Sequence, residues 1–329
     1  MWDVPQSGKL AKYGAVTTVT AIGLVLLRKW IAGGVCRSQA HLNGKTVLIT
    51  GSNTGIGKET ARDMAFRGAR VVMACRDMKR AEKAAEEIRH STGNENVVVQ
   101  ELDLASLQSV RQFVWDFVAS EDRLDILINN AGVMMCPQGL TADGFETQIG
   151  VNHLGHFLLT NLLLEKLKSS APSRVVNVSS VVHKGGKIHF DDLFFEKTPY
   201  NSLVSYRQSK LANVLFSREL ARRMKGTGVT SYALHPGVIR TELGRHVEAW
   251  SPLVLKMVLT APSVLLMKTP WQGAQTSIYC AVAEGLEDKS GCYFSDCAEK
   301  EPAPEGKDDL AALRLWEVSA QLVGYKEQN

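Results

Sequence analysis

The sequence predicts an α/β protein in which one doubly wound parallel sheet follows an N-terminal hydrophobic anchor. Short apolar runs rich in β-branched residues alternate with segments of helical periodicity over about 200 residues from Gly44 onward. Runs such as TVLIT and RVVNV are almost continuously apolar, which is typical of strands covered by helices on both faces. The 329 residues, 45% of them hydrophobic, are enough to build a sizeable core.

The predicted elements follow one another in a regular order. We expect strands at 46–50, 70–74, 97–102, 126–128, 174–178 and 229–234. We expect helices at 57–68, 78–90, 107–120, 155–168 and 203–225. No repeat or low-complexity stretch interrupts them. We therefore expect residues 43–329 to form a single domain and residues 1–42 to form the anchor and its linker.

Composition and charge exclude several classes of protein. With 27 Gly and 10 Pro the chain is not collagenous, and six cysteines without a CxxC pair do not indicate a disulfide scaffold or a zinc site. We predict reduced cysteines and no metal. The net charge of +4 comes from 38 basic and 34 acidic residues scattered along the chain, so no nucleic-acid partner is predicted.

The predicted anchor is the uncharged stretch 13–27, which has two lysines before it and Arg28 and Lys29 after it. Fifteen helical residues reach about 22 Å, and snorkelling lysines with Tyr13 and Trp30 at the interfaces extend this toward the roughly 30 Å hydrocarbon core. A cleaved signal peptide is the alternative. Retention is favoured because the small residues after Trp30 follow a basic cluster. Basic residues on both sides leave the orientation open.

A glycine-rich turn, TGSNTGIG, directly follows the first predicted strand. Its glycines allow a tight turn and a close approach to a pyrophosphate, and the next helix offers its N-terminal N–H groups to phosphate. Because the turn stands between a strand and a helix, we expect a dinucleotide site and a Rossmann-like fold. Its candidate cofactor-binding residues are Gly51, Ser52, Asn53, Thr54, Gly55, Ile56 and Gly57.

The end of the second predicted strand indicates which dinucleotide is bound. An NAD site places an acid about 20 residues after the glycine turn, but here Arg76 stands at that point. A guanidinium pairs well with a 2′-phosphate, so we expect NADP(H) and interpret Asp77 as the N-cap of the next helix. The alternative is a solvated Arg76, with Asp77 binding the ribose.

Polar residues that could carry out chemistry follow the later strands. They are the NNAG sequence at 129–132, Asn152, the pair Ser179-Ser180, and Tyr206 with Lys210 in YRQSK. Tyr206 and Lys210 are four residues apart and so share one face of a helix. A nearby ammonium favours the phenolate, which brings the pKa of a tyrosine down from about 10 toward the working range. YxxxK alone usually marks an exposed helix, so only the whole set of residues indicates a catalytic site.

In this order, TGxxxGIG, NNAG, Asn, Ser and YxxxK resemble the short-chain dehydrogenase/reductase family, from Asn43 to the C terminus. ILINNAGVMMCP and ALHPGV resemble its membrane-anchored, NADP-preferring retinol dehydrogenase subgroup. The resemblance implies four catalytic residues. Ser180 would orient the substrate carbonyl, with Ser179 as the alternative, and Tyr206 would exchange the proton. Lys210 would hold the nicotinamide ribose and lower the pKa of Tyr206, and Asn152 would support a water relay.

The same resemblance implies further cofactor contacts, with Asp103 facing the adenine. The others are Asn129, Ala131, Gly132, Pro236, Gly237, Val238 and Thr241, besides Tyr206 and Lys210 themselves.

The implied reaction is hydride transfer between NADP(H) and a lipophilic alcohol or aldehyde. A mostly reduced NADPH pool favours reduction of retinal to retinol, and steroids or fatty aldehydes remain alternative substrates. A non-catalytic NADP-binding membrane sensor or scaffold is the alternative of another class, since a fold does not fix a function. The complete set Asn152, Ser180, Tyr206 and Lys210 favours the enzyme. The subgroup implies the endoplasmic reticulum membrane or the mitochondrial inner membrane, and a homo-oligomer is left open.

Three further features are interpreted from their surroundings. Residues 250–267, within the segment near 245–270, are apolar but are interrupted by prolines. We expect this segment to be a substrate lid, and an ordinary core helix or a second membrane contact is the alternative. His153 and His156 lack a ligand cluster, so we expect them to pack rather than bind metal. Asn177 matches a glycosylation sequon but lies on a predicted strand, where we expect it to be inaccessible.

Overall fold

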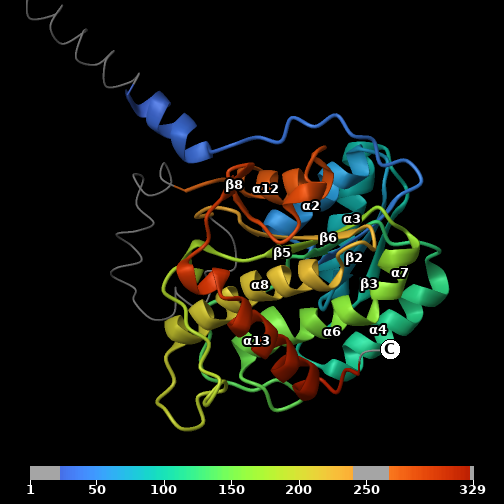
Figure 1. Ribbon diagram of the computed structural model, residues 1–329. Coiled ribbons are helices and arrows are strands. Elements are labelled where there is room, and N and C mark those ends of the chain that lie inside the picture. Colours follow the sequence, from blue (N-terminus) through green and yellow to red (C-terminus); the bar gives the residue numbers. More distant parts are fainter. Residues whose placement is uncertain (1–22, 240–266, 327–329) are drawn as a thin grey trace, which may run out of the picture.

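The fold is a Rossmann-like parallel sheet, described by a computed structural model for residues 23–239 and 267–326 (Figure 1). The strand order is β3-β2-β1-β4-β5-β6-β7-β8, and every pairing is parallel except that of β7 with β8. The strands are β1 (Thr46–Thr50), β2 (Arg70–Cys75), β3 (Val97–Glu101), β4 (Ile126–Asn129), β5 (Ser173–Val178), β6 (Val229–His235), β7 (Tyr293–Ser295) and β8 (Ala298–Lys300). The order reverses between β1 and β4, which is where doubly wound sheets bind their ligands.

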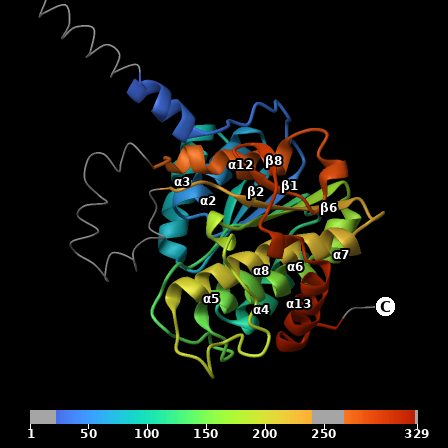
Figure 2. The same cartoon turned by 60° about the vertical axis from the view of Figure 1, so that its left-hand side comes forward.

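Helices cover both faces of this sheet. The main helices are α2 (Gly55–Phe66), α3 (Met78–Thr92), α4 (Leu107–Ser120), α6 (Gly155–Leu162), α7 (Leu164–Ser169), α8 (Ser202–Arg223), α12 (Pro270–Val282) and α13 (Asp309–Leu322). In Figures 1 and 2, α2, α3 and α12 lie on one face and α4, α6, α8 and α13 on the other. Met64 and Ile278 belong to the core of the first face, and Phe157 and Trp316 to that of the second. All of β1 is buried, as its continuous apolar run predicts.

Local signals set where several helices begin. The Asp77 carboxylate accepts a hydrogen bond from the Arg80 N–H, so Asp77 is the N-cap of α3, as predicted. Asn201 caps α8 in the same way. Thr269 and Gln272 form a capping box in front of α12, with Pro270 at its first position. Each of these caps therefore satisfies backbone N–H groups in the first turn of its helix.

One predicted helix is divided. The sequence predicts a single helix over 155–168, but a π-helical turn (Gly150–Leu154) leads into α6, and Leu163 separates α6 from α7. The periodicity of the apolar side chains runs through these breaks, so the pattern does not reveal them. π-turns inside helices are frequently found at functional sites, and this one carries Asn152.

The segment before the sheet lies partly within the described residues. A helix at 23–32 projects from the domain (Figure 1), and the Arg28 guanidinium binds the Met267 carbonyl at 3.0 Å. The following linker packs on the domain, because Cys36 and Ala40 contact the core of the first face. In the described part of the chain, no helix combines the length and apolar character needed to cross a bilayer. Most of the predicted anchor, Thr241 and nearly all of 250–267 lie outside the described residues.

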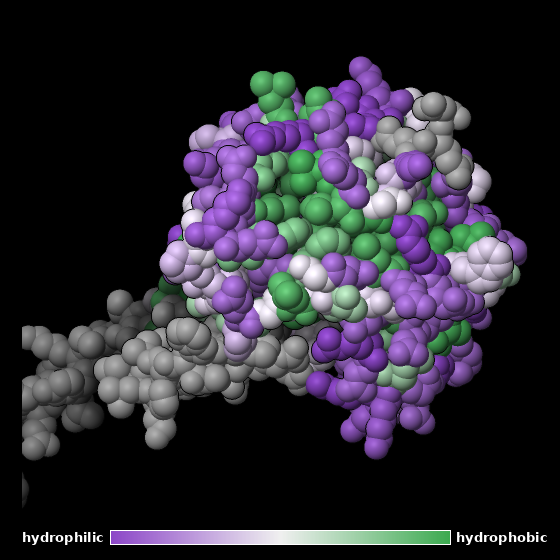
Figure 3. Space-filling model, turned by 90° about the horizontal axis from the view of Figure 1, so that it is seen from below, coloured by the Kyte–Doolittle hydropathy of each residue, from purple (hydrophilic) through white to green (hydrophobic). Residues whose placement is uncertain are grey.

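The face seen from below the view of Figure 1 is mixed in character. Hydrophobic residues are visible across its middle, and hydrophilic residues surround them (Figure 3). Separately, Phe190, Phe194 and Val318 are only partly buried and pack against a small cluster around Leu211 and Leu215.

Candidate active site

The glycine-rich turn after β1 requires its glycines. Gly51 and Gly55 have φ of +62° and +58°, which residues with a side chain rarely adopt. A Cβ on Gly51 would lie 2.9 Å from Ala131, and one on Gly57 would lie 2.5 Å from the Gly51 carbonyl oxygen. The N-cap of α2, Thr54, makes no side-chain hydrogen bond. The turn therefore brings its backbone close to the first N–H groups of α2, which no side chain caps.

A cavity of about 340 Å³ lies at this turn, at the carboxyl ends of β1, β2, β3 and β4. Ten predicted cofactor residues line it: Gly51, Asn53, Thr54, Gly55, Ile56, Gly57, Arg76, Asp103, Ala131 and Gly132. Ser52 does not, because its hydroxyl is buried and donates to the Ile49 carbonyl at 3.1 Å. The sequence pattern therefore predicts ten residues that line one continuous cavity.

Arg76 lies at the rim of this cavity. Its side chain is 65% exposed, and its guanidinium is 4.0 Å from the Asp103 carboxylate. Asp103 also accepts a hydrogen bond from the Ala105 N–H at 3.0 Å, which orients its carboxylate. Arg76 and Asp77 both line this end of the cavity, and Asp77 also caps α3.

Asn129 and Asn130 have different surroundings. The Asn129 amide is 1% exposed and donates to Thr160 and Asn177 between the strands and α6. The Asn130 amide donates to the carbonyls of Thr50 and Gly51 at 2.8 and 3.1 Å and so ties the turn after β4 to the glycine turn. Asn130 lines the cavity and Asn129 does not.

Tyr206, Lys210 and Ser180 converge where α8 crosses the end of β5. The Tyr206 hydroxyl is hydrogen-bonded to that of Ser180, and the Lys210 ammonium lies 5.7 Å from the centre of the Tyr206 ring. Lys210 donates to the Val178 carbonyl at 3.2 Å. The Ser179 hydroxyl points elsewhere, donating to the Lys210 carbonyl at 2.6 Å. The structure thus pairs Ser180, and not Ser179, with the tyrosine.

Burial controls the titration of this pair. It raises the pKa of Tyr206 to about 12, while the hydrogen bond with Ser180 acts in the lowering direction. Burial also lowers the pKa of Lys210 to about 8. The pKa of Tyr206 therefore moves in the direction opposite to the one that the YxxxK spacing predicts. The reason is that its hydroxyl lies inside the protein, where the charged phenolate is disfavoured.

Asn152 lies on the π-helical turn and is fully buried. Its amide accepts from the Val133 N–H at 2.8 Å and donates to the Val133 carbonyl at 2.9 Å and to the Ser209 hydroxyl at 2.9 Å. A Cβ on Gly132 would lie 3.0 Å from the Asn152 amide oxygen and 3.4 Å from the Lys210 ammonium. Asn152, Lys210 and the turn after β4 therefore meet at one point.

The predicted cofactor turn after β6 is only partly described. Gly237 has a φ of +105°, and its N–H donates to His235 at 3.1 Å. The Val238 side chain is 60% exposed, and its carbonyl accepts from the Lys268 N–H at 2.8 Å. Pro236, Gly237 and Val238 are not in the lining of the described cavity. Their contacts with a cofactor remain predictions.

The histidines and the sequon behave as packed residues. His153 contacts the Ser319 hydroxyl at 2.8 Å, and burial lowers its pKa to about 3. His156 is also buried, with a pKa lowered to about 4. Among the residues that the structure describes, no three His, Cys, Asp or Glu side chains form a metal-binding group. Asn177 is 1% exposed, so the sequon is inaccessible as predicted.

The sequence and the fold place this site in a known family. The family model for short chain dehydrogenase matches residues 45–252. The chain belongs to this family. It is therefore a nicotinamide-dependent oxidoreductase that acts on CH–OH groups.

Named relatives cover nearly the whole of this short chain dehydrogenase. Retinol dehydrogenase 12 of Homo sapiens is 59% identical over 300 residues, which are 91% of this chain and 93% of the relative. Retinol dehydrogenase 13 of Homo sapiens is 55% identical over 300 residues, which are 91% of each chain.

Solved structures share the fold. An uncharacterized protein from Mycobacterium paratuberculosis is 36% identical with a TM-score of 0.73, covering 90% of this chain and all of the other. A short chain dehydrogenase from Escherichia coli CFT073, complexed with NADPH, has a TM-score of 0.62 at 24% identity over 79% of this chain and 99% of its own.

Several residues of this short chain dehydrogenase site are absent from the sequence prediction. Arg80, Val133, Met134, Thr147 and Val151 line the cavity together with Asn130. Arg80 stands three residues after the predicted N-cap Asp77, so the first turn of that helix could have been searched for a second cation. Thr147 and Val151 lie on short helical segments whose positions no motif marks.

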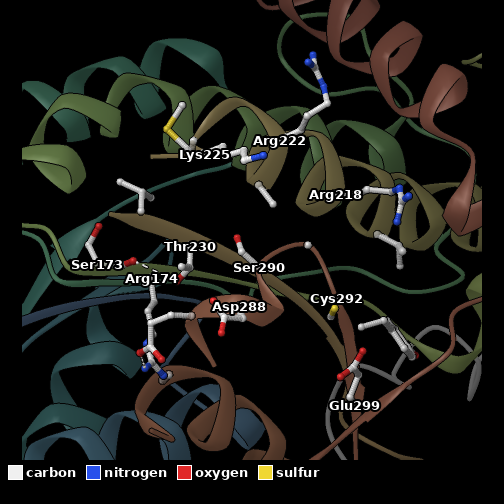
Figure 4. A pocket seen from close by; sticks show the side chains of 18 of the residues that line it. Ser173, Arg174, Arg218, Arg222, Lys225, Thr230, Asp288, Ser290, Cys292 and Glu299 are labelled. Carbon is white, nitrogen blue, oxygen red and sulfur yellow. Dashed lines mark hydrogen bonds and ion pairs between the residues drawn. The ribbon is translucent and has the colours of Figure 1, made fainter. Parts of the chain in front are cut away.

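A larger cavity, of about 980 Å³, lies at the opposite, amino-terminal end of the strands. It contains none of the predicted site residues. Figure 4 shows Arg218 and Arg222 of α8, and Lys225 just beyond its end, lying across it from Asp288 and Ser290. Arg218 is paired with Asp309. This cavity of the short chain dehydrogenase is therefore separate from the predicted catalytic residues.

Proposed function

We propose that this enzyme interconverts retinal and retinol with NADP(H), and that reduction of retinal and other lipophilic aldehydes is the favoured direction. The observation that carries the proposal is the convergence of Ser180, Tyr206 and Lys210 beside the dinucleotide cavity. The names of the relatives support retinoids as the substrate class, because two retinol dehydrogenases are 59% and 55% identical over nine-tenths of the chain.

The described residues fit NADP(H). The glycine turn leaves no space for side chains, and the amino end of α2 has no side-chain cap, so backbone N–H groups are available to a pyrophosphate. Arg76 and Arg80 line the end of the cavity at β2 and α3, where they would hold a 2′-phosphate. Asp103 would face the adenine ribose end, and Lys210 the nicotinamide ribose.

Bound NADPH supplies the hydride, and the protein supplies alignment and a proton. The Ser180 and Tyr206 hydroxyls are hydrogen-bonded to each other, so both can converge on one carbonyl oxygen, where negative charge develops. With its pKa raised to about 12, Tyr206 retains its proton at neutral pH. A protonated phenol is the form that reduction of an aldehyde requires. Asn152 holds the Val133 turn and Ser209 in place beside it.

The test is a substrate panel with the purified full-length chain. We expect oxidation of NADPH in the presence of retinal, with formation of retinol, and much slower turnover with NADH. A steroid ketone and a medium-chain aldehyde are the comparison substrates. If the enzyme turns over either of these but not retinal, its substrate class is steroids or fatty aldehydes and not retinoids. NADPH binding without turnover of any of the three would favour a non-catalytic sensor.

We also propose that the N-terminal segment holds the enzyme at a membrane, of the endoplasmic reticulum or the mitochondrial inner membrane. The uncharged stretch 13–27 supports this, as do the exposed side chains of Leu26 and Trp30, at 60% and 80%. The test is alkaline carbonate extraction of membranes that carry the full-length chain. A membrane-spanning segment stays in the pellet, whereas complete extraction would contradict spanning.

A further inference from the structure

His156 joins the cofactor side of the site to its catalytic side. It lies on α6, is 2% exposed, and its two ring nitrogens make different contacts. Nε2 lies 2.8 Å from the Thr50 hydroxyl at the end of β1, directly before the glycine turn. Nδ1 lies 3.1 Å from the carbonyl oxygen of Asn152 on the π-helical turn. One buried ring thus spans the distance between the two motifs.

The partners determine which nitrogen carries the proton. A carbonyl oxygen only accepts, so Nδ1 is the donor to Asn152. In a neutral imidazole Nε2 is then an acceptor, and the Thr50 hydroxyl donates to it. Burial keeps the ring neutral, because it lowers the pKa of His156 to about 4, and the Lys210 ammonium acts in the same direction. The His156 ring is therefore held in one tautomer.

This tautomer completes the hydrogen bonding of Thr50. Once the hydroxyl proton is donated to His156, the Thr50 oxygen accepts from the N–H groups of Asn130 and Ala131, both at 3.0 Å. These two residues form the turn that closes the cavity beside Gly51. The Ile128 carbonyl oxygen is a second acceptor for the Thr50 hydroxyl but lies 3.5 Å away, so the closer Nε2, at 2.8 Å, sets the orientation of the hydroxyl and with it the position of the turn.

The other end of the link reaches the reacting residues. The Asn152 amide is bonded to the Ser209 hydroxyl at 2.9 Å, and that hydroxyl donates to the Tyr206 carbonyl at 2.8 Å. A chain of hydrogen bonds therefore runs from Thr50 through His156 and Asn152 to the backbone of α8 at Tyr206.

We propose that His156 is a positioning residue that holds the dinucleotide turn and Asn152 in register with each other. It touches neither substrate nor reacting atoms. The inference depends on the proposed function only in taking NADP(H) as the cofactor. Loss of the two hydrogen bonds of His156, which link Thr50 to Asn152, should weaken NADPH binding and slow turnover together. The reason is that both the dinucleotide turn and Asn152 would then shift.

The chain offers a matched control at His153. This histidine is 1% exposed, three residues away, and its ring contacts Ser319 on α13 rather than the cofactor turn. Phenylalanine keeps most of the ring volume at either position but makes no hydrogen bond. We therefore compare His156→Phe with His153→Phe in the full-length enzyme by NADPH titration, by kcat with retinal, and by thermal unfolding.

We expect both variants to lose stability. His156→Phe should also weaken NADPH binding and lower kcat by at least about threefold more than His153→Phe. Equal effects of the two variants on binding and turnover, within about threefold, would overturn the positioning role. Wild-type enzyme that binds no NADPH would overturn the proposed function instead.

Thr50 provides a second test that does not remove the ring. Thr50→Val deletes the hydroxyl at constant shape, and Thr50→Ser restores it. If the link acts as one unit, Thr50→Val combined with His156→Phe should cost little more than His156→Phe alone in NADPH affinity. Additive losses in this double-mutant cycle, or failure of Thr50→Ser to restore affinity, would contradict the link.

Discussion

The Ser179 hydroxyl donates to the carbonyl oxygen of Lys210 at 2.6 Å and so fixes the end of β5 to α8. Its neighbour Ser180 is left to bond the Tyr206 hydroxyl. Two adjacent serines therefore have separate tasks, one in holding the helix and one at the reacting oxygen.

This division predicts that alanine at Ser180 lowers turnover, whereas alanine at Ser179 lowers stability. Ser180→Ala should lower kcat by about 100-fold, because it removes a donor to the developing oxyanion. Ser179→Ala should lower the free energy of unfolding by about 1 kcal/mol and change kcat by less than about threefold. Steady-state kinetics and denaturant unfolding of both variants check this. A larger kcat loss for Ser179→Ala would reverse the assignment.

Cofactor preference depends on Arg76. Its guanidinium lies at the cavity rim, 4.0 Å from Asp103. Arg76→Ala should weaken NADPH binding by about 2 kcal/mol and leave NADH binding nearly unchanged. Fluorescence titration with both cofactors measures this, with Arg314→Ala on α13 as a control for loss of one arginine. Equal weakening of NADPH and NADH would remove the phosphate role from Arg76.

Acid stability depends on the buried histidines. Burial lowers the pKa of His153 to about 3 and that of His156 to about 4, below the usual 6.5. Between pH 6.5 and about 4 the unfolded chain binds more protons than the folded one, so stability falls as the pH falls. His153 alone should account for about 2.5 kcal/mol at pH 4.5. Urea unfolding at pH 7.5 and 4.5 should show a shallower pH dependence for His153→Phe. An unchanged dependence would contradict its neutral state.

The N-terminal boundary of the stable domain lies before the first strand. Cys36 and Ala40 pack on the core, and Arg67 donates to the carbonyls of Ser38 and Ala40 at 3.0 and 2.9 Å. Deleting residues 1–30 should leave the unfolding temperature nearly unchanged, whereas deleting 1–42 should lower it by at least about 4 °C. Calorimetry of the two truncated chains measures both unfolding temperatures. Equal unfolding temperatures would mean that the linker contributes nothing.

Strands β1 to β6 could be predicted from the sequence because both faces of this sheet are covered, which leaves continuous apolar runs. β7 and β8 could not, since three residues give no periodicity. The π-turn at Asn152 depends on which backbone groups pair, and side-chain patterns do not carry that information.

Within the site, motif spacing predicted the glycine turn and the Ser180, Tyr206 and Lys210 cluster. It marked Asn130 only as part of NNAG and predicted only packing for His156, because the roles of both come from contacts between distant elements. The pKa of Tyr206 was expected to fall because spacing reports the nearby Lys210 but not the depth of burial, which dominates.

Proton transfer by Tyr206 is the central claim. The most direct measurement is kcat with retinal and NADPH for Tyr206→Phe, together with the NADPH dissociation constant. We predict that kcat falls below a tenth of the wild-type value while the dissociation constant stays within about twofold, because the phenol acts in the transition state. A variant that keeps more than about a tenth of the wild-type kcat, a barrier change under ~1.4 kcal/mol, would contradict it.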